Sequence, residues 1–312
     1  MPTFLANFDF DDRLAGRTGG SRMPPPRRNP PPESHLFRLL TSDPVRVLVA
    51  SLARGVSAAA EGPLAKAAFE PANPHRETEF EPWGWCSLAD RLAGRFGAAA
   101  SVVAAAERVN HRRFAAELTG GEWTRDVDAV LRRAAAGERL MMKSAQGGFG
   151  RGLRRILGPE TDANLAGWVR RRCRHGGLLV EPLVPAESEY ATHFDVGESG
   201  VARLGQTELT ATEHGQFESS VAEPGFTADV PESVAAAAEA VRGSGYRCPL
   251  SIDSARLPGG GWRAVQDVNA RWTVGRVALL ASRRLGCRVE VRNDAGRWSV
   301  RTPEGDFPVA GR

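Results

Sequence analysis

Lysine is nearly absent from this chain. Lys66 and Lys143 are the only two in 312 residues, although Lys and Arg together number 41. The four cysteines are widely spaced and form no CxxC pair, which argues against a zinc or disulfide framework and favours reduced thiols. No apolar run approaches the ~18 residues that a membrane helix needs, and the N-terminus lacks a signal-peptide pattern. We therefore expect a cytoplasmic protein with no membrane partner.

A strong excess of charge of one sign is also missing. The 41 basic and 37 acidic residues give a formal net charge of +4. A nucleic-acid binder usually concentrates more positive charge on one surface, so we expect no nucleic-acid partner. The arginine run 170–174 is most simply a solvated helix face. An RNA-associated role for these arginines ranks last among the alternatives, because no aromatic-interleaved basic surface accompanies them.

The length and composition indicate a globular protein with two domains or more. With 42% hydrophobic and 25% charged residues, the chain has an ordinary globular composition. Short strands alternating with helical segments predict a small α/β domain up to about residue 107. No G-x-G-x-x-G motif occurs in it, so a dinucleotide role is unsupported. The Pro-rich segment 19–32 predicts a surface loop, with a PxxP-type ligand as the less favoured alternative.

The clearest chemical pattern runs from Pro249 to Gly275. An apolar run carries Asp253, a Gly-rich turn follows, and a second apolar run carries Asp267 and Asn269. Alternation places Asp267 and Asn269 on the same face of a strand, and a hairpin would bring Asp253 beside them. Two carboxylates and an amide oxygen are hard ligands of the kind that magnesium accepts. A polar hairpin face in water explains the same pattern.

A second pattern surrounds the rare lysine. Lys143 ends a predicted strand and is followed by the glycines Gly147, Gly148 and Gly150. Glycine lets backbone N–H groups approach phosphate oxygens, and a nearby lysine adds a positive charge for the same oxygens. This is not a Walker A loop, because the lysine precedes the glycines. A flexible hairpin tip explains the glycines equally well.

The order of these features along the chain resembles the ATP-grasp superfamily of carboxylate–amine ligases. A lysine strand and Gly-rich loop are followed by a helix, an apolar strand with Glu181, an acidic segment and the Asp…Asp-x-Asn hairpin. The resemblance covers roughly 108–285. It implies an α+β, α/β-type fold with two α+β lobes around an ATP cleft, preceded by a small α/β domain. The expected divisions are 1–107, 108–180 with the lysine and Gly-rich loop, 181–285 with the metal site, and a C-terminal hairpin over 286–312.

The resemblance also implies a nucleotide site. Lys143 would contact the α- and β-phosphates of ATP, and the backbone from Gly147 to Gly150 would close over the β- and γ-phosphates. Glu181 would accept a hydrogen bond from the adenine amine, and Leu183 would supply a backbone N–H. Glu189 matches the acidic residue that holds the ribose hydroxyls.

The metal and catalytic residues follow from the same resemblance. Asp253, Asp267 and Asn269 match the magnesium ligands, with Mn²⁺ as an alternative ion. Arg271 would meet the substrate carboxylate or the transferring phosphoryl group and, with Lys143, would be catalytic.

Two positions depart from the pattern of the family. The family has glutamate where this chain has Asp267, so the side chain is one methylene shorter here. The family also has a further lysine early in the first lobe, where the candidates are Arg112 or Arg113. Arginine still binds phosphate, and Arg112 is the residue expected at the nucleotide.

The function implied is ATP-dependent formation of an amide or peptide bond through an acyl phosphate. The substrates would be a small-molecule or peptide carboxylate and an amine, and Glu208, Arg271 and Arg276 are the candidates for the substrate pocket. A non-catalytic ATP-binding module with a sensing or scaffolding role is the alternative that the two departures keep open. A homodimer is one assembly compatible with this reading.

Overall fold

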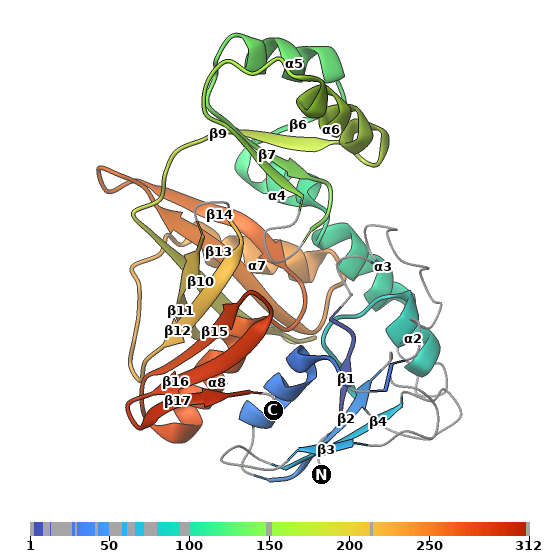
Figure 1. Ribbon diagram of the computed structural model, residues 1–312, viewed down its shortest axis with the longest axis vertical. Coiled ribbons are helices and arrows are strands. Elements are labelled where there is room, and N and C mark those ends of the chain that lie inside the picture. Colours follow the sequence, from blue (N-terminus) through green and yellow to red (C-terminus); the bar gives the residue numbers. More distant parts are fainter. Residues whose placement is uncertain are drawn as a thin grey trace.

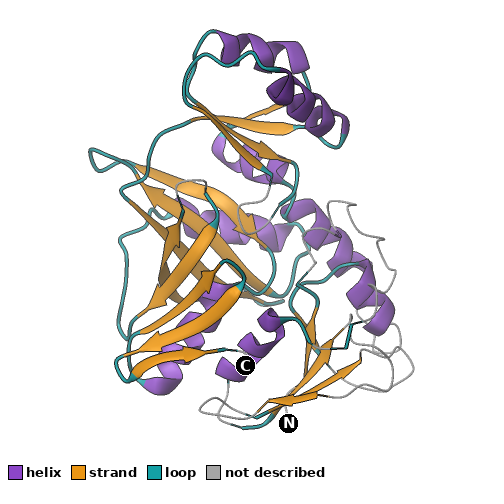
Figure 2. Cartoon of the chain, in the orientation of Figure 1, coloured by secondary structure: helices purple, strands orange, loops and turns teal. Residues whose placement is uncertain are grey.

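The computed structural model of the chain describes residues 3–8, 13, 27–28, 30–40, 43–49, 58–60, 66–71, 80–93, 100–147, 152–212 and 215–309. Most of the Pro-rich segment 19–32 lies outside these residues. The described strands form three sheets, of five, four and eight strands. Figure 1 shows the four-stranded sheet at one end of the molecule, above the eight-stranded sheet, with the five-stranded sheet beside the opposite end. Figure 2 shows how helices cover these sheets.

The N-terminal part is a small α/β unit, as the alternating pattern predicts. Its sheet has the order β3-β4-β2-β1-β5, parallel except for β3. Val45, Val47 and Val49 of β2 are fully buried, since β-branched residues suit the interior of a parallel sheet. The elements are β1 (Thr3–Ala6), the 3-10 helix η1 (Pro32–Leu39), β2 (Val45–Val49), β3 (Ala58–Ala60), β4 (Ala67–Pro71), β5 (Glu81–Pro82), α2 (Ser87–Ala93) and α3 (Ala100–Val109).

The four-stranded antiparallel sheet has the order β6-β9-β7-β8. Asp126 and Asp162 cap two of its helices by accepting hydrogen bonds from backbone N–H groups. Those helices bury Val130, Leu165 and Val169 against the sheet. The elements are α4 (Arg112–Thr119), β6 (Glu122–Thr124), α5 (Val127–Ala135), β7 (Leu140–Ser144), β8 (Leu153–Ile156), α6 (Ala163–Arg174) and β9 (Leu178–Pro182).

The eight-stranded sheet has the order β14-β13-β10-β11-β12-β15-β16-β17, with antiparallel neighbours. Its two faces carry different helices: Ile252 packs against α7, whereas the adjacent Ser251 faces α8. The elements are β10 (Ser188–Val196), β11 (Val201–Ala211), β12 (Phe217–Ala222), α7 (Ser233–Gly243), β13 (Pro249–Arg256), β14 (Trp262–Asn269), α8 (Val274–Leu285), β15 (Val289–Asp294), β16 (Arg297–Thr302) and β17 (Gly305–Pro308).

The C-terminal strands correct one expected division. The sequence predicts an appended hairpin over 286–312, but β15 pairs with β12 and continues the eight-stranded sheet through β16 and β17. Val289 and Val291 of β15 are fully buried in the cluster that also contains Val277 of α8. Alternating apolar residues thus extend the core, so these strands belong to the large sheet.

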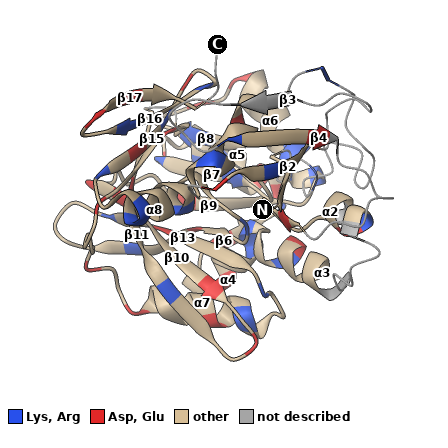
Figure 3. Cartoon of the chain, turned by 90° about the horizontal axis from the view of Figure 1, so that it is seen from below, with Lys and Arg blue, Asp and Glu red and all other residues tan. Residues whose placement is uncertain are grey.

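The distribution of charged and hydrophobic residues over the structure agrees with the composition of the sequence. Figure 3 shows basic and acidic residues interspersed among the elements rather than gathered by sign. Within the described ranges, no helix combines the length and the hydrophobicity that crossing a bilayer requires.

Candidate functional site

A cleft of about 570 Å³ lies where the four-stranded and eight-stranded sheets meet. This volume lies in the range of small-molecule sites. Strands β7, β8, β10, β11, β13 and β14, the linker after β9 and the start of α8 supply its walls. The charged and amide side chains in its lining include Arg112, Lys143, Glu189, Asp253, Asp267, Asn269 and Arg271.

The hairpin of β13 and β14 brings the predicted metal ligands together. Asp253 lies directly opposite Asp267 in the strand register, and Asn269 lies opposite Ser251. Asn269 Nδ2 donates to Asp253 Oδ2 at 2.9 Å. The two carboxylates and the amide therefore share one face of the hairpin, because side chains alternate along each strand.

The two aspartates have opposite pKa shifts. Burial raises the pKa of Asp253 to about 7, and the charge of Asp267 adds to this effect. Burial also opposes ionisation of Asp267, but the neighbouring charges of Arg112 and Lys143 outweigh it and lower the pKa of Asp267. The site thus holds one firmly ionised carboxylate and one that resists ionisation.

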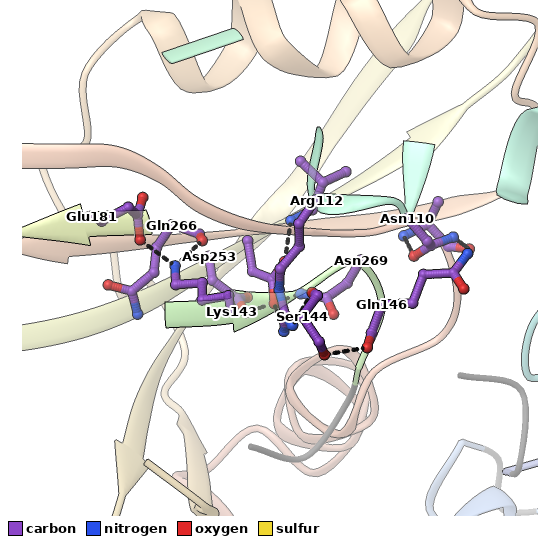
Figure 4. A network of polar contacts seen from close by, with 12 residues as sticks. Asn110, Arg112, Lys143, Ser144, Gln146, Glu181, Asp253, Gln266 and Asn269 are labelled. Atoms are coloured by element: carbon purple, nitrogen blue, oxygen red, sulfur yellow. Dashed lines mark hydrogen bonds and ion pairs between the residues drawn. The ribbon is translucent and has the colours of Figure 1, made fainter. Parts of the chain in front are cut away.

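Arg112 joins the two sides of the cleft (Figure 4). Its Nη2 donates to Asp267 Oδ2 at 2.9 Å, and its Nη1 donates to the carbonyl oxygen of Ser144 at 3.0 Å. Only 4% of Arg112 is exposed. Arg113 instead lies on the exposed side of α4, where it pairs with Glu117. Of the two candidate arginines, the structure brings Arg112 into the cleft.

Lys143 is buried and paired within the cleft. Its Nζ lies 2.8 Å from Glu181 Oε2 and donates to the carbonyl oxygen of Gln266 at 2.8 Å. Gln266 Nε2 in turn donates to Glu189 Oε1 at 3.1 Å. Figure 4 shows Glu181, Lys143 and Gln266 joined in this way. The carboxylate of Glu181, expected at the adenine amine, is therefore engaged by Lys143.

The linker after β9 differs from the expectation at one position. The N–H of Leu183 donates to the carbonyl oxygen of Arg139 at 2.9 Å, so it is not presented to the cleft. Val184 also lines the cleft, and its N–H has no acceptor among the described residues. Sequence alone does not show which linker N–H the neighbouring strand uses, because that depends on tertiary pairing.

Arg271 lies beside the metal-ligand candidates. Its Nη2 donates to Asn269 Oδ1 at 2.9 Å, and its Nη1 donates to the Trp272 carbonyl oxygen at 3.2 Å. The side chain is 6% exposed and lines the cleft. Arg271 is therefore placed to neutralise negative charge in the cleft.

Asn110 holds the segment between Asn269 and Arg271, a role that the sequence did not reveal. Its Oδ1 accepts from the N–H of Ala270 at 2.9 Å, and its Nδ2 donates to the Ala270 carbonyl oxygen at 3.3 Å. Its Nδ2 also donates to the Ala106 carbonyl oxygen at 2.8 Å. The N-cap of α4 is the next residue, His111, so Asn110 is free for this role.

The N-terminal sheet supports the same segment from another side. The N–H of Trp272 donates to the Trp83 carbonyl oxygen at 2.8 Å, and its indole Nε1 donates to Glu81 Oε1 at 2.8 Å. Trp272 is 5% exposed. The N-terminal unit therefore fixes the backbone that follows Arg271.

Neither protein-family models nor curated proteins gave a match. Among solved structures, the ADP complex of PurK, an N5-carboxyaminoimidazole ribonucleotide synthetase, matches with TM-score 0.51 and 12% identity over 88% of this chain and 83% of that chain. Biotin carboxylase from Campylobacter jejuni matches with TM-score 0.50 and 12% identity over 68% of this chain and 58% of that chain. Pyruvate carboxylase from Rhizobium etli also has TM-score 0.50, with 16% identity over 67% of this chain and 20% of that chain.

The chain has the ATP-grasp fold. Identities this low establish the fold alone. The match spans 50% to 58% of the length of the first four solved structures. The expected α+β architecture around a cleft is confirmed.

The two positions at which the sequence departs from the ATP-grasp resemblance lie together in the cleft. Arg112 and Asp267 form an ion pair across it, with Nη2 and Oδ2 2.9 Å apart.

The oxygen donors in the cleft fit magnesium in their chemistry. Asp253 and Asp267 offer carboxylate oxygens, and turning the amide of Asn269 would add its oxygen. Within the described ranges, no cluster of three or more His, Cys, Asp or Glu side chains is placed to hold a metal ion. An ion at this site would therefore depend on Asn269 and on oxygens from a bound ligand.

Two expected substrate residues do not reach the cleft. On β11, Leu209 lies opposite Glu189 and lines the cleft, so alternation turns Glu208 to the other face. Arg276 is buried, donates to the Phe194 carbonyl oxygen at 2.9 Å and pairs with Asp195. The start of α8 lines the cleft instead, through Thr273, Val274 and Gly275.

The glycines are only partly described. Gly147 is the last described residue before the loop, and Gly148 and Gly150 lie outside the described residues. The flanking strands pair as a hairpin, with Lys143 opposite Leu153.

Proposed function

We propose that the protein is an ATP-dependent carboxylate–amine ligase that works through an acyl phosphate. The observation that carries this proposal is the meeting of Lys143, Arg112 and Arg271 with Asp253 and Asp267 in one cleft of an ATP-grasp fold. Cations beside a pair of carboxylates are the groups that phosphoryl transfer requires. The similar PurK structure is an ADP complex, and the similar Campylobacter biotin carboxylase structure is a β-γ-ATP complex.

In the proposed reaction, a substrate carboxylate oxygen attacks the γ-phosphorus of ATP, and ADP leaves. The amine nitrogen then attacks the acyl carbon, phosphate leaves with the proton that the nitrogen gives up, and an amide forms. Lys143 and Arg112 bind phosphate oxygens, and Arg271 neutralises charge on the carboxylate or the transferring group. Asp253, Asp267 and Asn269 would hold Mg²⁺, or Mn²⁺, which neutralises phosphate charge when bound.

We place the nucleoside part of ATP beside the linker after β9. We place adenine against Val184, whose N–H has no acceptor among the described residues, rather than against Leu183, whose N–H is bonded to Arg139. Glu189 lines the cleft and would accept from the ribose hydroxyls. Lys143 would have to leave Glu181 for the phosphates, which would free that carboxylate at the linker.

The deciding experiment measures ADP release with Mg-ATP over paired carboxylates and amines, including amino acids and dipeptides. We expect release that depends on a carboxylate, and hydroxylamine should trap the acyl phosphate as a hydroxamate. Arg113→Gln serves as the control because Arg113 is exposed and pairs with Glu117. If wild type fails to bind Mg-ATP in a thermal-shift assay, the proposal is wrong.

A second candidate, an ATP-binding module without turnover, is favoured by one observation. Arg112 neutralises Asp267, so the candidate metal site is charge-balanced without an ion. This module would show a thermal shift with Mg-ATP but no carboxylate-dependent ADP release or hydroxamate over the screened pairs.

A further inference from the structure

Three oxygens of the candidate metal site already have partners within the chain. Asp267 Oδ2 accepts from Arg112 Nη2 at 2.9 Å, and Asp253 Oδ2 accepts from Asn269 Nδ2 at 2.9 Å. Asn269 Oδ1 accepts from Arg271 Nη2 at 2.9 Å. Each of these three side chains therefore already has one oxygen engaged by a side-chain donor of the protein.

This network carries no surplus of negative charge. Two carboxylates, Asp253 and Asp267, face two guanidinium groups, Arg112 and Arg271, which are 4% and 6% exposed. A divalent cation that entered alone would add two positive charges beside two buried guanidiniums. Repulsion at such short range is strong where water is largely excluded. A polyphosphate would bring the negative charge that reverses this balance.

Arg112 has a further feature that points to an anionic ligand. Its Nε is buried and has no hydrogen-bond partner in the described part of the chain. A buried N–H donor without an acceptor is unfavourable, so an oxygen-rich anion in the cleft would gain from meeting it. The guanidinium is thus partly committed to Asp267 and Ser144 and partly unsatisfied.

We propose that Arg112 determines the specificity of the metal site: it closes the site while no nucleotide is bound, and a divalent cation binds only together with a polyphosphate. Phosphate oxygens draw the guanidinium away from Asp267, and the released carboxylate, with Asp253, then takes the cation. This inference rests on the proposed function, because it assigns the nucleotide to the same cleft.

The test measures binding of Mn²⁺ to the full chain by electron paramagnetic resonance, with and without ADP. Wild type should bind no Mn²⁺ at saturable sites up to millimolar concentration alone, and should bind it when ADP is present. Arg112→Gln removes the positive charge and should bind Mn²⁺ without nucleotide at least about tenfold more tightly than wild type. Adding Asp267→Asn to that variant should abolish the gain. Arg113→Gln is the matched control from the same helix and should behave as wild type.

The outcomes separate this inference from the proposed function. If wild type binds Mn²⁺ alone as tightly as Arg112→Gln does, or if Arg112→Gln gains nothing, the role of Arg112 is wrong while the ligase proposal stands. If wild type binds a fluorescent ATP analogue neither with nor without Mn²⁺, the proposed function fails and this inference fails with it. Far-ultraviolet circular dichroism checks folding. Arg112→Lys, whose single ammonium cannot bridge Asp267 and Ser144 as a guanidinium does, should give an intermediate gain and provides a second route should Arg112→Gln not fold.

Discussion

The two arms of the cleft position their charged groups in different ways. On the large-sheet arm, β13 and β14 hold Asp253, Asp267 and Asn269 through the register of one hairpin. On the small-sheet arm, Lys143 is held by Glu181 of its own sheet and by the Gln266 carbonyl oxygen of the other arm. Strand pairing therefore fixes the positions of the charged groups on the large-sheet arm. Those on the small-sheet arm are held by side-chain contacts that a ligand could replace.

This difference assigns separate roles to the two arms. A bound ligand does not compete with the hydrogen bonds that pair two strands, so the carboxylates keep their relative positions whether or not the cleft is filled. Ion pairs such as Lys143 with Glu181 and Arg112 with Asp267 exchange readily for phosphate oxygens, because the phosphate offers the same charge. Substitutions on the small arm should therefore act on nucleotide binding, and those around the large arm on the reaction and on stability.

The largest expected effect follows the removal of Lys143. Lys143→Ala should abolish the rise in melting temperature caused by Mg-ATP and lower kcat at least about 100-fold, the size seen when a group that neutralises transition-state charge is lost. Thermal shift and ADP release measure the two effects. Lys66→Ala is the matched control, since Lys66 is the only other lysine.

Loss of Lys143 also leaves Glu181 buried without its counter-ion, which could destabilise the protein by itself. The double variant Lys143→Ala, Glu181→Gln removes the unpaired negative charge as well. If the double variant regains the thermal shift with Mg-ATP, Lys143 acts only on stability and not on the nucleotide.

A smaller effect is expected at Asn110, which supports the backbone of the large-sheet arm beside Arg271. Asn110→Ala should lower kcat by about tenfold, because a small misplacement of groups around Arg271 is costly, while the KM for ATP stays within about twofold. Asn110 bonds both backbone groups of Ala270 but does not line the cleft. Asn164→Ala on the exposed start of α6 should leave both constants unchanged. An equal change in kcat for the two variants would exclude the positioning role.

The large arm should also carry a pH-dependent part of the stability. Burial lowers the pKa of His193 to about 3, and the charges of Arg276 and Arg283 add to this effect. The unfolded chain therefore binds this proton more readily, so the contribution of neutral His193 is complete above about pH 6.5 and is lost as the pH falls toward 3. Below pH 6.5 this loss approaches ~1.4 kcal/mol per pH unit.

His193→Gln tests this contribution by urea unfolding at a series of pH values. At pH 7.5 the variant should be less stable, because His193 bonds Ser251 and Thr207 at 2.7 and 3.0 Å. Between pH 6.5 and 4.5 the difference from wild type should shrink. A difference that stays constant over this interval would mean that the pKa of His193 is the same in the folded and the unfolded chain.

The contrast between the arms also explains what the sequence could predict. Asp253, Asp267 and Asn269 were predictable because alternation and one short turn determine their relative positions. The pairing of Lys143 with Glu181 depends on two strands 38 residues apart in the chain, and the choice of Arg112 over Arg113 depends on which face of α4 is buried. Neither follows from local spacing.

Long-range packing accounts for the other differences. Asn110 and Ala270 are 160 residues apart in the chain, so no sequence motif predicts their contact. The sequence predicts a C-terminal hairpin because the pairing of β15 with β16 is local, whereas the pairing of β15 with β12 joins distant parts of the chain. The sequence predicts Glu208 in the substrate pocket, but Glu208 neighbours Leu209, which pairs with Glu189 and lines the cleft, so its side chain lies on the other face of the sheet. That register depends on long-range pairing.

The smallest effect is expected at Glu208, and it tests which face of β11 meets the substrates. Glu208→Ala should leave KM for both substrates within about twofold of wild type and change stability by no more than ~0.5 kcal/mol, as is usual for exposed positions. Leu209→Ala, one residue along the same strand, removes a side chain that lines the cleft and should raise KM. Steady-state kinetics on the two variants gives the comparison directly. Should Glu208→Ala raise KM and Leu209→Ala leave it unchanged, the substrates bind on the face of the large sheet that packs against α7, and the cleft between the arms holds the nucleotide alone.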